Sequence, residues 1–324
     1  MIRTLSYKTK QFFVVLIKLC IVVGAFYFMY HKLTNNYELE LSEFVVFLHK
    51  NDFFSIENGL FLIFLTIINW FFEIVKWRYL VSSVTSISFK NASEQSLGAL
   101  TASLLTPNRI GEYGAKAIYY QKPFRTKIML LNLIGNMLQM SATIIFGVIG
   151  LLFFVNQYSL ELDVVKLSFF FLIVILIYAL LFYAIRKIRF KIKGFSLKKI
   201  REFVRAMSSD VKIKAFIFSV IRYMIFSFQF YFLLQIFDVN ITYVSAMMVI
   251  TTMYLLSSVI PSIFIFDVVI KGSVAVYLFS MLGVNDLTVL CVVTLMWVLN
   301  FVIPSVFGSY YVLNFNLPKV EDTL

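Results

Sequence analysis

Apolar residues gather in long runs along nearly the whole chain, separated by short polar segments. A helix rises about 1.5 Å per residue, so a run of about 20 residues crosses a hydrocarbon core of about 30 Å. Not every apolar segment is continuous: those at about 95–119 and 242–281 are interrupted by proline and charged residues. The pattern predicts an all-α polytopic membrane protein. The runs that are long enough to span lie at about 11–30, 59–75, 128–155, 164–185, 215–236 and 287–313.

Composition narrows the class of protein further. Hydrophobic residues make up 60% of the 324 residues and charged residues 14%, against roughly 45–50% and about 25% in soluble domains. This balance excludes a soluble enzyme. Both cysteines, Cys20 and Cys291, lie in apolar runs without the spacing of a disulfide framework or a zinc site. The sequence also lacks the common nucleotide-binding, hydrolase and metalloprotease motifs, so we expect no cofactor, no metal and no catalytic residue.

The placement of Lys and Arg predicts the orientation of the chain. Segment 186–214 is rich in Lys and Arg, whereas 156–163 has two acids and no base. Because basic loops stay in the cytoplasm, we expect 186–214 there, together with both termini, in a bacterial plasma membrane. Apolar residues recur in this segment at near-helical spacing, which predicts an amphipathic linker that contacts anionic phospholipid headgroups and no nucleic acid.

The two interrupted segments predict re-entrant hairpins. Bases flank 95–119 on both sides, at Lys90 and Lys122. If this segment crossed the membrane fully, every later basic loop would lie outside the cytoplasm. The segment is therefore expected to enter from the cytoplasm and return. Because each crossing changes the side of the membrane, the acidic flanks of 242–281 lie outside. The second hairpin is therefore expected to enter from the opposite face.

The order of elements then repeats upside down. Six full transmembrane helices and two hairpins form an inverted-topology repeat within a single domain covering 1–324. Repeat 1 covers about 11–155 and repeat 2 about 164–313. This arrangement is typical of secondary transporters, which bind substrate near the bilayer midplane where broken helices meet.

Each hairpin carries an acid followed four residues later by a lysine, a spacing that places both on one helix face. The first reads LLTPNRIGEYGAKAIYY, with Glu112 and Lys116, and the second VIPSIFIFDVVIKGSVAVY, with Asp267 and Lys271. A charge at the bilayer centre costs roughly 2.5–3.5 kcal/mol, so these residues require partners or water. They predict a polar midplane site; the alternative is that each pair only neutralises itself and holds its hairpin.

Arg109 stands at the break in the first hairpin, without an acid four residues later. Asn108 precedes it, and Gly111 and Gly114 leave little bulk nearby. Backbone amides and a guanidinium at a helix start are groups that bind phosphate. We therefore expect Arg109 and Asn108 to bind an anionic headgroup.

Polar residues within other apolar runs are candidates to support this site. Glu73 and Arg222 occupy equivalent positions in the two halves, and Asn132, Asn136 and Gln139 form a stripe on one helix face. Two alternatives stay open. Glu73 can instead pair with a base on its own helix, and the stripe can serve helix packing.

The segment TPNRIGEYGAKA, residues 106–117, follows SLGALTASLL and precedes LNLIGN. It resembles the signature of the lysylphosphatidylglycerol synthase transmembrane region, also called the flippase-like domain family, and the likeness extends over essentially the whole chain. The resemblance implies a role like that of the membrane half of the bacterial multiple peptide resistance factor, which moves aminoacylated phosphatidylglycerol between leaflets. The second hairpin departs from the family in lacking glycine over 262–266, and the aminoacyl-transferase domain is missing, so we expect no synthesis of lysyl-phosphatidylglycerol.

The leading hypothesis is a stand-alone flippase for a phospholipid or lipid-linked headgroup. Arg109 would bind the phosphate, and the paired hairpin charges would line the path. One alternative is a non-catalytic scaffold for an envelope-synthesis enzyme. Another is an intramembrane transferase that uses Glu112 or Asp267 as a base.

Overall fold

The computed structural model describes residues 55–104, 106, 109–158, 197–259 and 266–316, with a few isolated positions before residue 50. Within 197–200, at 259 and within 266–270 only the backbone is described. The predicted spans 11–30 and 164–185 lie outside these ranges, apart from isolated positions in the first. Over the described ranges the regular elements are helices, and no strand occurs.

Four long helical units in the described part are long and apolar enough to cross a membrane. They coincide with four of the predicted spans. Large apolar side chains such as Leu152, Phe153 and Phe307 are exposed on their outer faces, which is the pattern expected for helices that contact lipid. The chain is therefore a multi-pass membrane protein. The units are α3 (Ile56–Val81), α6 (Lys122–Gln157), α9 (Ser209–Ile236) and the continuous series α12 (Asp286–Trp297), η3 (Val298–Val302) and α13 (Ile303–Asn314).

Local signals explain where these helices begin. Ser55 caps α3 by accepting a hydrogen bond from the backbone amide of Asn58. Asn285 caps α12 in the same way, and a proline occupies the first turn of α6, where no amide donor is needed. The π-helix η3 interrupts the last unit near its middle.

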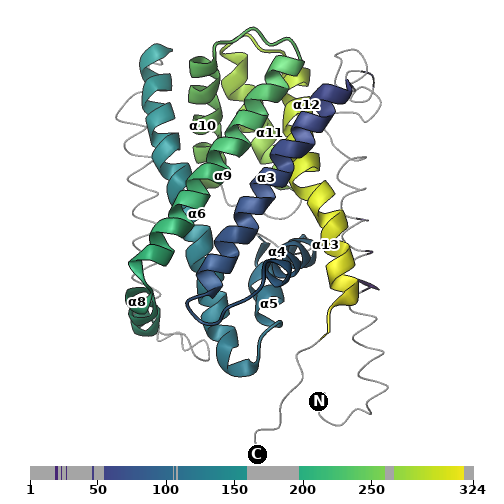
Figure 1. Cartoon of the computed structure of the whole chain (residues 1–324). Coiled ribbons are helices and arrows are strands. Elements are labelled where there is room, and N and C mark those ends of the chain that lie inside the picture. The colour runs from purple at the N-terminus through teal and green to yellow at the C-terminus, as the bar shows by residue number, and fades with distance from the viewer. Residues whose placement is uncertain are drawn as a thin grey trace, which may run out of the picture.

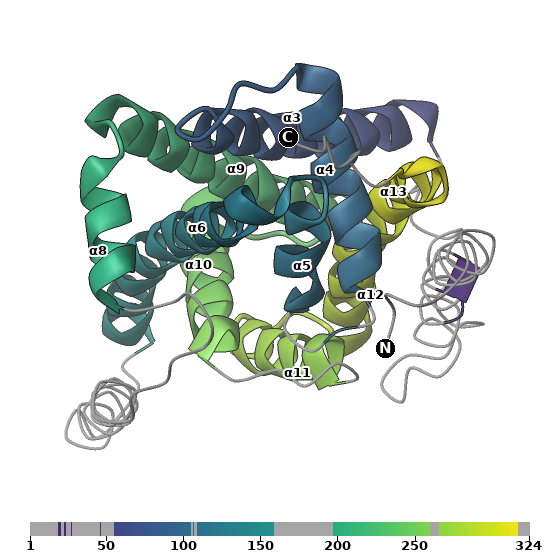
Figure 2. The same cartoon turned by 90° about the horizontal axis from the view of Figure 1, so that it is seen from below.

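The two interrupted apolar segments fold as pairs of shorter helices. The first pair is α4 (Phe89–Ser103) and α5 (Gly111–Ala117), and the second is α10 (Tyr243–Val259) and α11 (Phe266–Ser280). Figure 1 shows α4 and α5 in the lower half of the bundle and α10 and α11 in the upper half. Figure 2, the view from below, shows α5 inside the outline formed by the surrounding helices. The pairs thus occupy opposite ends of the bundle.

The long unit that follows each helix pair packs against the first helix of the other pair. Helix α6 lies along α10, α13 lies along α4, and α3 lies along α9. Glycines permit the close approach at both crossed contacts: a Cβ added at Gly150 would overlap Thr251 of α10, and one added at Gly308 would overlap Leu97 and Thr101 of α4. Exchanging the two halves therefore maps these contacts onto each other.

Basic residues collect at the lower end of the bundle. Helix α3 ends there, near Arg78, and α6 begins there at Lys122. The same end holds α8 (Leu197–Ala206), within the predicted amphipathic linker. Phe203 and Val204, on the apolar side of this region, pack against the core of the bundle. The predicted helix exists, but protein contacts cover these apolar residues, so its exposed basic face is what remains for lipid headgroups.

Candidate functional site

A layer of polar side chains crosses the bundle at the middle of its four long units. Arg222 lies 13 residues after Ser209 and 14 before Ile236. At about 1.5 Å per residue, either end of α9 is roughly 20 Å away. Three further residues hold the same central position in their units. With Arg222 they form the mid-length layer: Asn69, Gln139, Arg222 and Asn300.

Arg222 connects this layer. Its Nε donates to the backbone oxygen of Asn69 at 3.2 Å and to Oδ1 of the same residue at 3.1 Å. Its Nη1 donates to Oε1 of Gln139 at 3.2 Å. Asn69 Nδ2 in turn donates to Oδ1 of Asn300 at 2.8 Å. Four helices that are distant in sequence are thereby joined through one set of hydrogen bonds.

Glu73 links the layer to charges nearer the lower end. It forms ion pairs with Arg222 of α9 and with Lys76 of its own helix, the latter at 2.6 Å. The pair with a base on its own helix, which the sequence left open, is therefore present, and Glu73 pairs in addition with Arg222 in the other half. Lys76 is 4% exposed, so this pairing takes place inside the protein.

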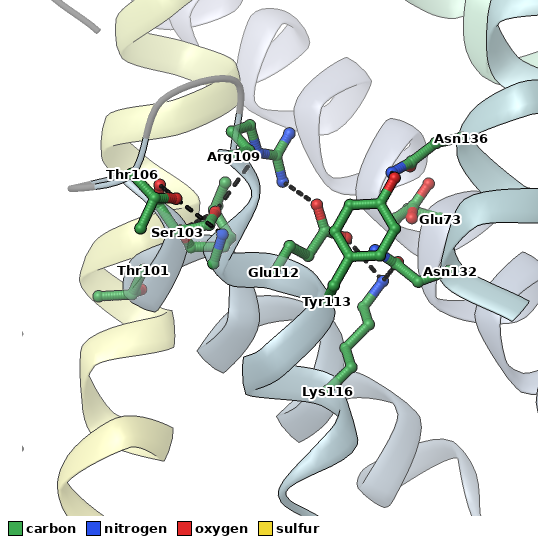
Figure 3. A network of polar contacts seen from close by, with 12 residues as sticks. Glu73, Thr101, Ser103, Thr106, Arg109, Glu112, Tyr113, Lys116, Asn132 and Asn136 are labelled. Carbon is green, nitrogen blue, oxygen red and sulfur yellow. Dashed lines mark hydrogen bonds and ion pairs between the residues drawn. The ribbon is translucent and has the colours of Figure 1, made fainter. Parts of the chain in front are cut away.

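Glu112 of α5 receives two cations in the same way, as Figure 3 shows. Its Oε1 lies 2.7 Å from Lys116 Nζ and its Oε2 lies 3.1 Å from Arg109 Nη2. Lys116 Nζ also donates to Oδ1 of Asn132 at 2.8 Å and lies 4.2 Å from the ring centroid of Trp77. The side chain of Lys116 is 2% exposed. We call the six residues the charge cluster: Glu73, Lys76, Arg109, Glu112, Lys116 and Arg222.

Arg109 adopts a left-handed backbone conformation, with φ of 55°. This conformation is uncommon outside glycine, and here it turns the guanidinium towards Glu112 at i+3. Arg109 has no acid at i+4, but the acid three residues later, Glu112, is its partner. The guanidinium also lies 5.7 Å from the ring centroid of Phe301 on η3, and its side chain stays 39% exposed. Asn108 lies outside the described residues.

The turn before α5 is tight. The Gly111 amide donates to Oγ1 of Thr106 at 2.8 Å, and a Cβ on Gly111 would lie 2.8 Å from the Thr106 side chain. Glycine is therefore required for this close approach. Because α5 has only seven residues, its backbone dipole is small, and the positive potential near Arg109 comes from side chains.

Lys271 of α11 lines a largely apolar pocket. Aromatic rings from α9, α10, α12 and η3 line this pocket, and one of them is Phe301. Phe301 therefore contacts both the pocket and the guanidinium of Arg109. The side chain of Asp267 lies outside the described part, so the predicted pair with Lys271 is not described.

The polar stripe on α6 has one buried member, Asn132, one half-buried member, Gln139, and one exposed member, Asn136. Asn132 accepts from Lys116, Asn136 Nδ2 donates to the hydroxyl of Tyr113 at 3.2 Å, and Gln139 accepts from Arg222. These contacts connect α6 to α5 and α9, so the stripe serves helix packing and also adjoins the charge cluster.

Sequence reasoning missed Asn69 and Asn300, which the structure places at the centre of the layer. Asn300 Nδ2 also donates to Oε1 of Gln229 at 2.9 Å, and Gln229 donates to Thr66. A lone amide in the middle of a long apolar run is the signal that would have identified all three amide side chains, since a buried polar group requires a partner.

Among the described side chains, no group of three or more His, Cys, Asp or Glu is placed to hold a metal ion. The arrangement instead offers guanidinium and ammonium donors, which suit anionic oxygen.

The chain belongs to the lysylphosphatidylglycerol synthase TM region family, whose sequence model matches residues 15–308. This confirms the family suspected from the hairpin motif and assigns the chain a lipid-related role in the membrane. No curated protein and no solved structure matches the chain.

Proposed function

We propose that this member of the lysylphosphatidylglycerol synthase TM region family moves a phospholipid or lipid-linked headgroup between the leaflets of a bacterial plasma membrane. The observation that carries the proposal is the charge cluster, which lies inside a bundle whose outer surface is apolar. A charge in hydrocarbon costs several kcal/mol, so ionisable residues inside a membrane typically mark a substrate path. A lipid headgroup needs such a path, because moving its polar or charged part through the hydrocarbon carries the same kind of cost.

The architecture supports alternating access. We infer six transmembrane helices and two re-entrant hairpins in an inverted repeat. The first repeat covers about 11–155 and the second about 164–313. The α4–α5 and α10–α11 pairs lie at opposite ends of the bundle, which supports this view. The packing supports it too, because α6 contacts the second pair through α10 and α13 contacts the first pair through α4. In such folds one repeat rocks against the other around a central site.

Within this scheme the basic end of the bundle faces the cytoplasm, as do both chain termini. Arg109 is the most exposed member of the charge cluster, with 39% of its side chain exposed, so it is the member most accessible to a headgroup. Its guanidinium would bind phosphate oxygens in a fork. Glu112 and Lys116 would then exchange part of their mutual pairing for contacts with the headgroup, and Asp267 and Lys271 would receive it in the other half.

The test is lipid translocation in reconstituted vesicles. A short-chain phospholipid with a fluorescent headgroup label is incorporated, and a membrane-impermeant reductant quenches the outer leaflet. Vesicles with the native protein should lose nearly all fluorescence, and protein-free vesicles about half. Arg109→Ala should slow the loss. Lys214→Ala is the matched control, because Lys214 pairs with Asp210 at the surface, outside the charge cluster.

Other outcomes would favour the alternatives. Normal lipid binding without translocation would favour a scaffold for an envelope-synthesis enzyme. A change in the headgroup's mass after incubation would favour an intramembrane transferase with Glu112 or Asp267 as base.

A further inference from the structure

The charge cluster carries more positive than negative charge. It contains four bases, Lys76, Arg109, Lys116 and Arg222, but only two carboxylates, Glu73 and Glu112. Each carboxylate is shared by two bases, so neither can neutralise both. Among the described side chains the formal balance of the cluster is therefore two positive charges.

The cluster consists of two ion-paired groups, one around Glu73 and one around Glu112, and all of its members except Arg109 are largely buried. Lys116 and Lys76 are 2% and 4% exposed, and the two carboxylates are 8% and 12% exposed. Charges this far from water are weakly screened. Leaving a buried charge without a counter-ion costs several kcal/mol, so the excess favours an anion that enters from outside the protein.

A further donor in the cluster has no acceptor. Asn132 is 2% exposed, and its Oδ1 accepts from Lys116, which directs Nδ2 elsewhere. That Nδ2 is buried and has no hydrogen-bond partner among the described residues. An unpaired buried donor costs about 1–3 kcal/mol. An acceptor that occupies the site would remove this penalty.

We infer that the ligand of this site presents a phosphate with about two negative charges, as a phosphomonoester or diphosphate does, and not a cationic aminoacyl headgroup. This inference rests on the proposed function. A phosphomonoester carries about −1.5 to −2 at neutral pH, which balances the excess of the cluster. A phosphodiester leaves one positive charge uncompensated. A lysylated headgroup adds positive charge to a site that is already positive.

Native mass spectrometry of the purified full chain measures this preference. Three lipids with identical acyl chains compete at equal concentration: phosphatidic acid, phosphatidylglycerol and lysyl-phosphatidylglycerol. We expect occupancy to fall in that order, with roughly tenfold between the first and the last, because like charges in an enclosed site repel. Equal or higher occupancy by lysyl-phosphatidylglycerol would overturn the inference, as would equal occupancy by the first two lipids.

Two variants locate the preference. Arg109→Gln removes one positive charge at the partly exposed edge of the cluster, and should reduce the ratio of phosphatidic acid to phosphatidylglycerol severalfold. Lys214→Gln removes the same charge from an exposed pair, where Lys214 is 43% exposed, and should leave the ratio unchanged. An equal change in both variants would mean that overall charge, and not the cluster, sets the preference.

Inorganic pyrophosphate identifies the source of the anion. If the site needs the lipid tail, millimolar pyrophosphate will not raise the melting temperature of the delipidated protein. If pyrophosphate does raise the melting temperature, the site accepts free anions. Both results are consistent with a site for a doubly charged phosphate.

Translocation separates this inference from the proposed function. Selective binding of phosphatidic acid without translocation of any lipid would refute transport alone, whereas translocation that favours lysyl-phosphatidylglycerol would refute the charge inference alone.

Discussion

Arg222 on α9 donates through Nε to both the backbone oxygen and the side-chain oxygen of Asn69 on α3, at 3.2 and 3.1 Å. Both residues lie at the middle of their helices. Helices α3 and α9 pack along each other, so this contact joins the two halves of the chain at the centre of the bundle. It also leaves Nη1 of Arg222 directed at Glu73 and Gln139.

Replacement of Arg222 should therefore destabilise the bundle. Arg222→Gln removes the cation that Glu73 receives from α9 and leaves Asn69 without a charged donor. We expect a loss of about 3–5 kcal/mol in unfolding free energy, typical when one partner of a buried ion pair is removed. Arg222→Lys retains the charge but not the fork, and should lose less. Unfolding in mixed micelles measures both, and an unchanged Arg222→Gln variant would contradict the proposed central role of this contact.

Glu112 and Lys116 should behave differently alone and together. Lys116→Leu leaves Glu112 with only Arg109 and should cost about 3–5 kcal/mol, whereas Glu112→Leu combined with Lys116→Leu should restore most stability, because a whole buried pair is often replaceable. Translocation should nevertheless be lost in the double variant. A double variant that folds and still transports would show that the pair only holds the hairpin.

Gly308 tests the crossed packing of the two halves. Gly308→Ala places a methyl group against Leu97 and Thr101 of α4 and should destabilise the protein by about 1–3 kcal/mol, the usual cost of overpacking. Gly59→Ala is the matched control, because a Cβ at Gly59 meets nothing within 4 Å. In a helix this change should be neutral or stabilising by up to about 1 kcal/mol. Similar melting temperatures for both variants would argue against a close contact between α13 and α4.

Arg109 should bind lipid through its guanidinium and not only through its charge. Arg109→Lys should fold normally and bind phospholipid more weakly, and Arg109→Ala more weakly still, as measured by native mass spectrometry. Arg109→Gly adds a control for folding, because glycine adopts the positive φ of this position without strain. It should melt no lower than Arg109→Ala while binding equally little lipid. Full lipid occupancy in Arg109→Lys would contradict the phosphate assignment.

Cysteine labelling tests the orientation in the membrane. In a variant without native cysteines, single cysteines at Lys90, Lys122 and Lys198 should react only from the cytoplasm, because basic flanks remain there. Cysteines at Asp286 and at Glu43, which lies outside the described residues, should react from the other side. Labelling of positions 90 and 122 from opposite faces would contradict both the re-entrant hairpin and the inverted repeat.

Much of the fold follows from local properties of the sequence. The predicted run 215–236 became α9 (Ser209–Ile236), and 287–313 became the α12 to α13 unit, because run length and capping residues act within a few turns. The pair of Glu112 with Lys116 was predictable for the same reason, since residues four apart share a helix face.

The partners across helices depend on the tertiary structure. Asn69 bonds to Asn300, 231 positions away, and Arg222 reaches Glu73 over 149 positions. The rotation of each helix and the choice of its neighbours decide these contacts, and neither quantity is written in local spacing. Arg109 shows the same limit at short range, because its pairing with Glu112 depends on a left-handed backbone turn. The sequence thus determined which residues must be buried polar groups, by placing them in apolar runs. Only the packed bundle decided which of them meet, because a buried charge is stabilised by whichever side chain the neighbouring helix presents.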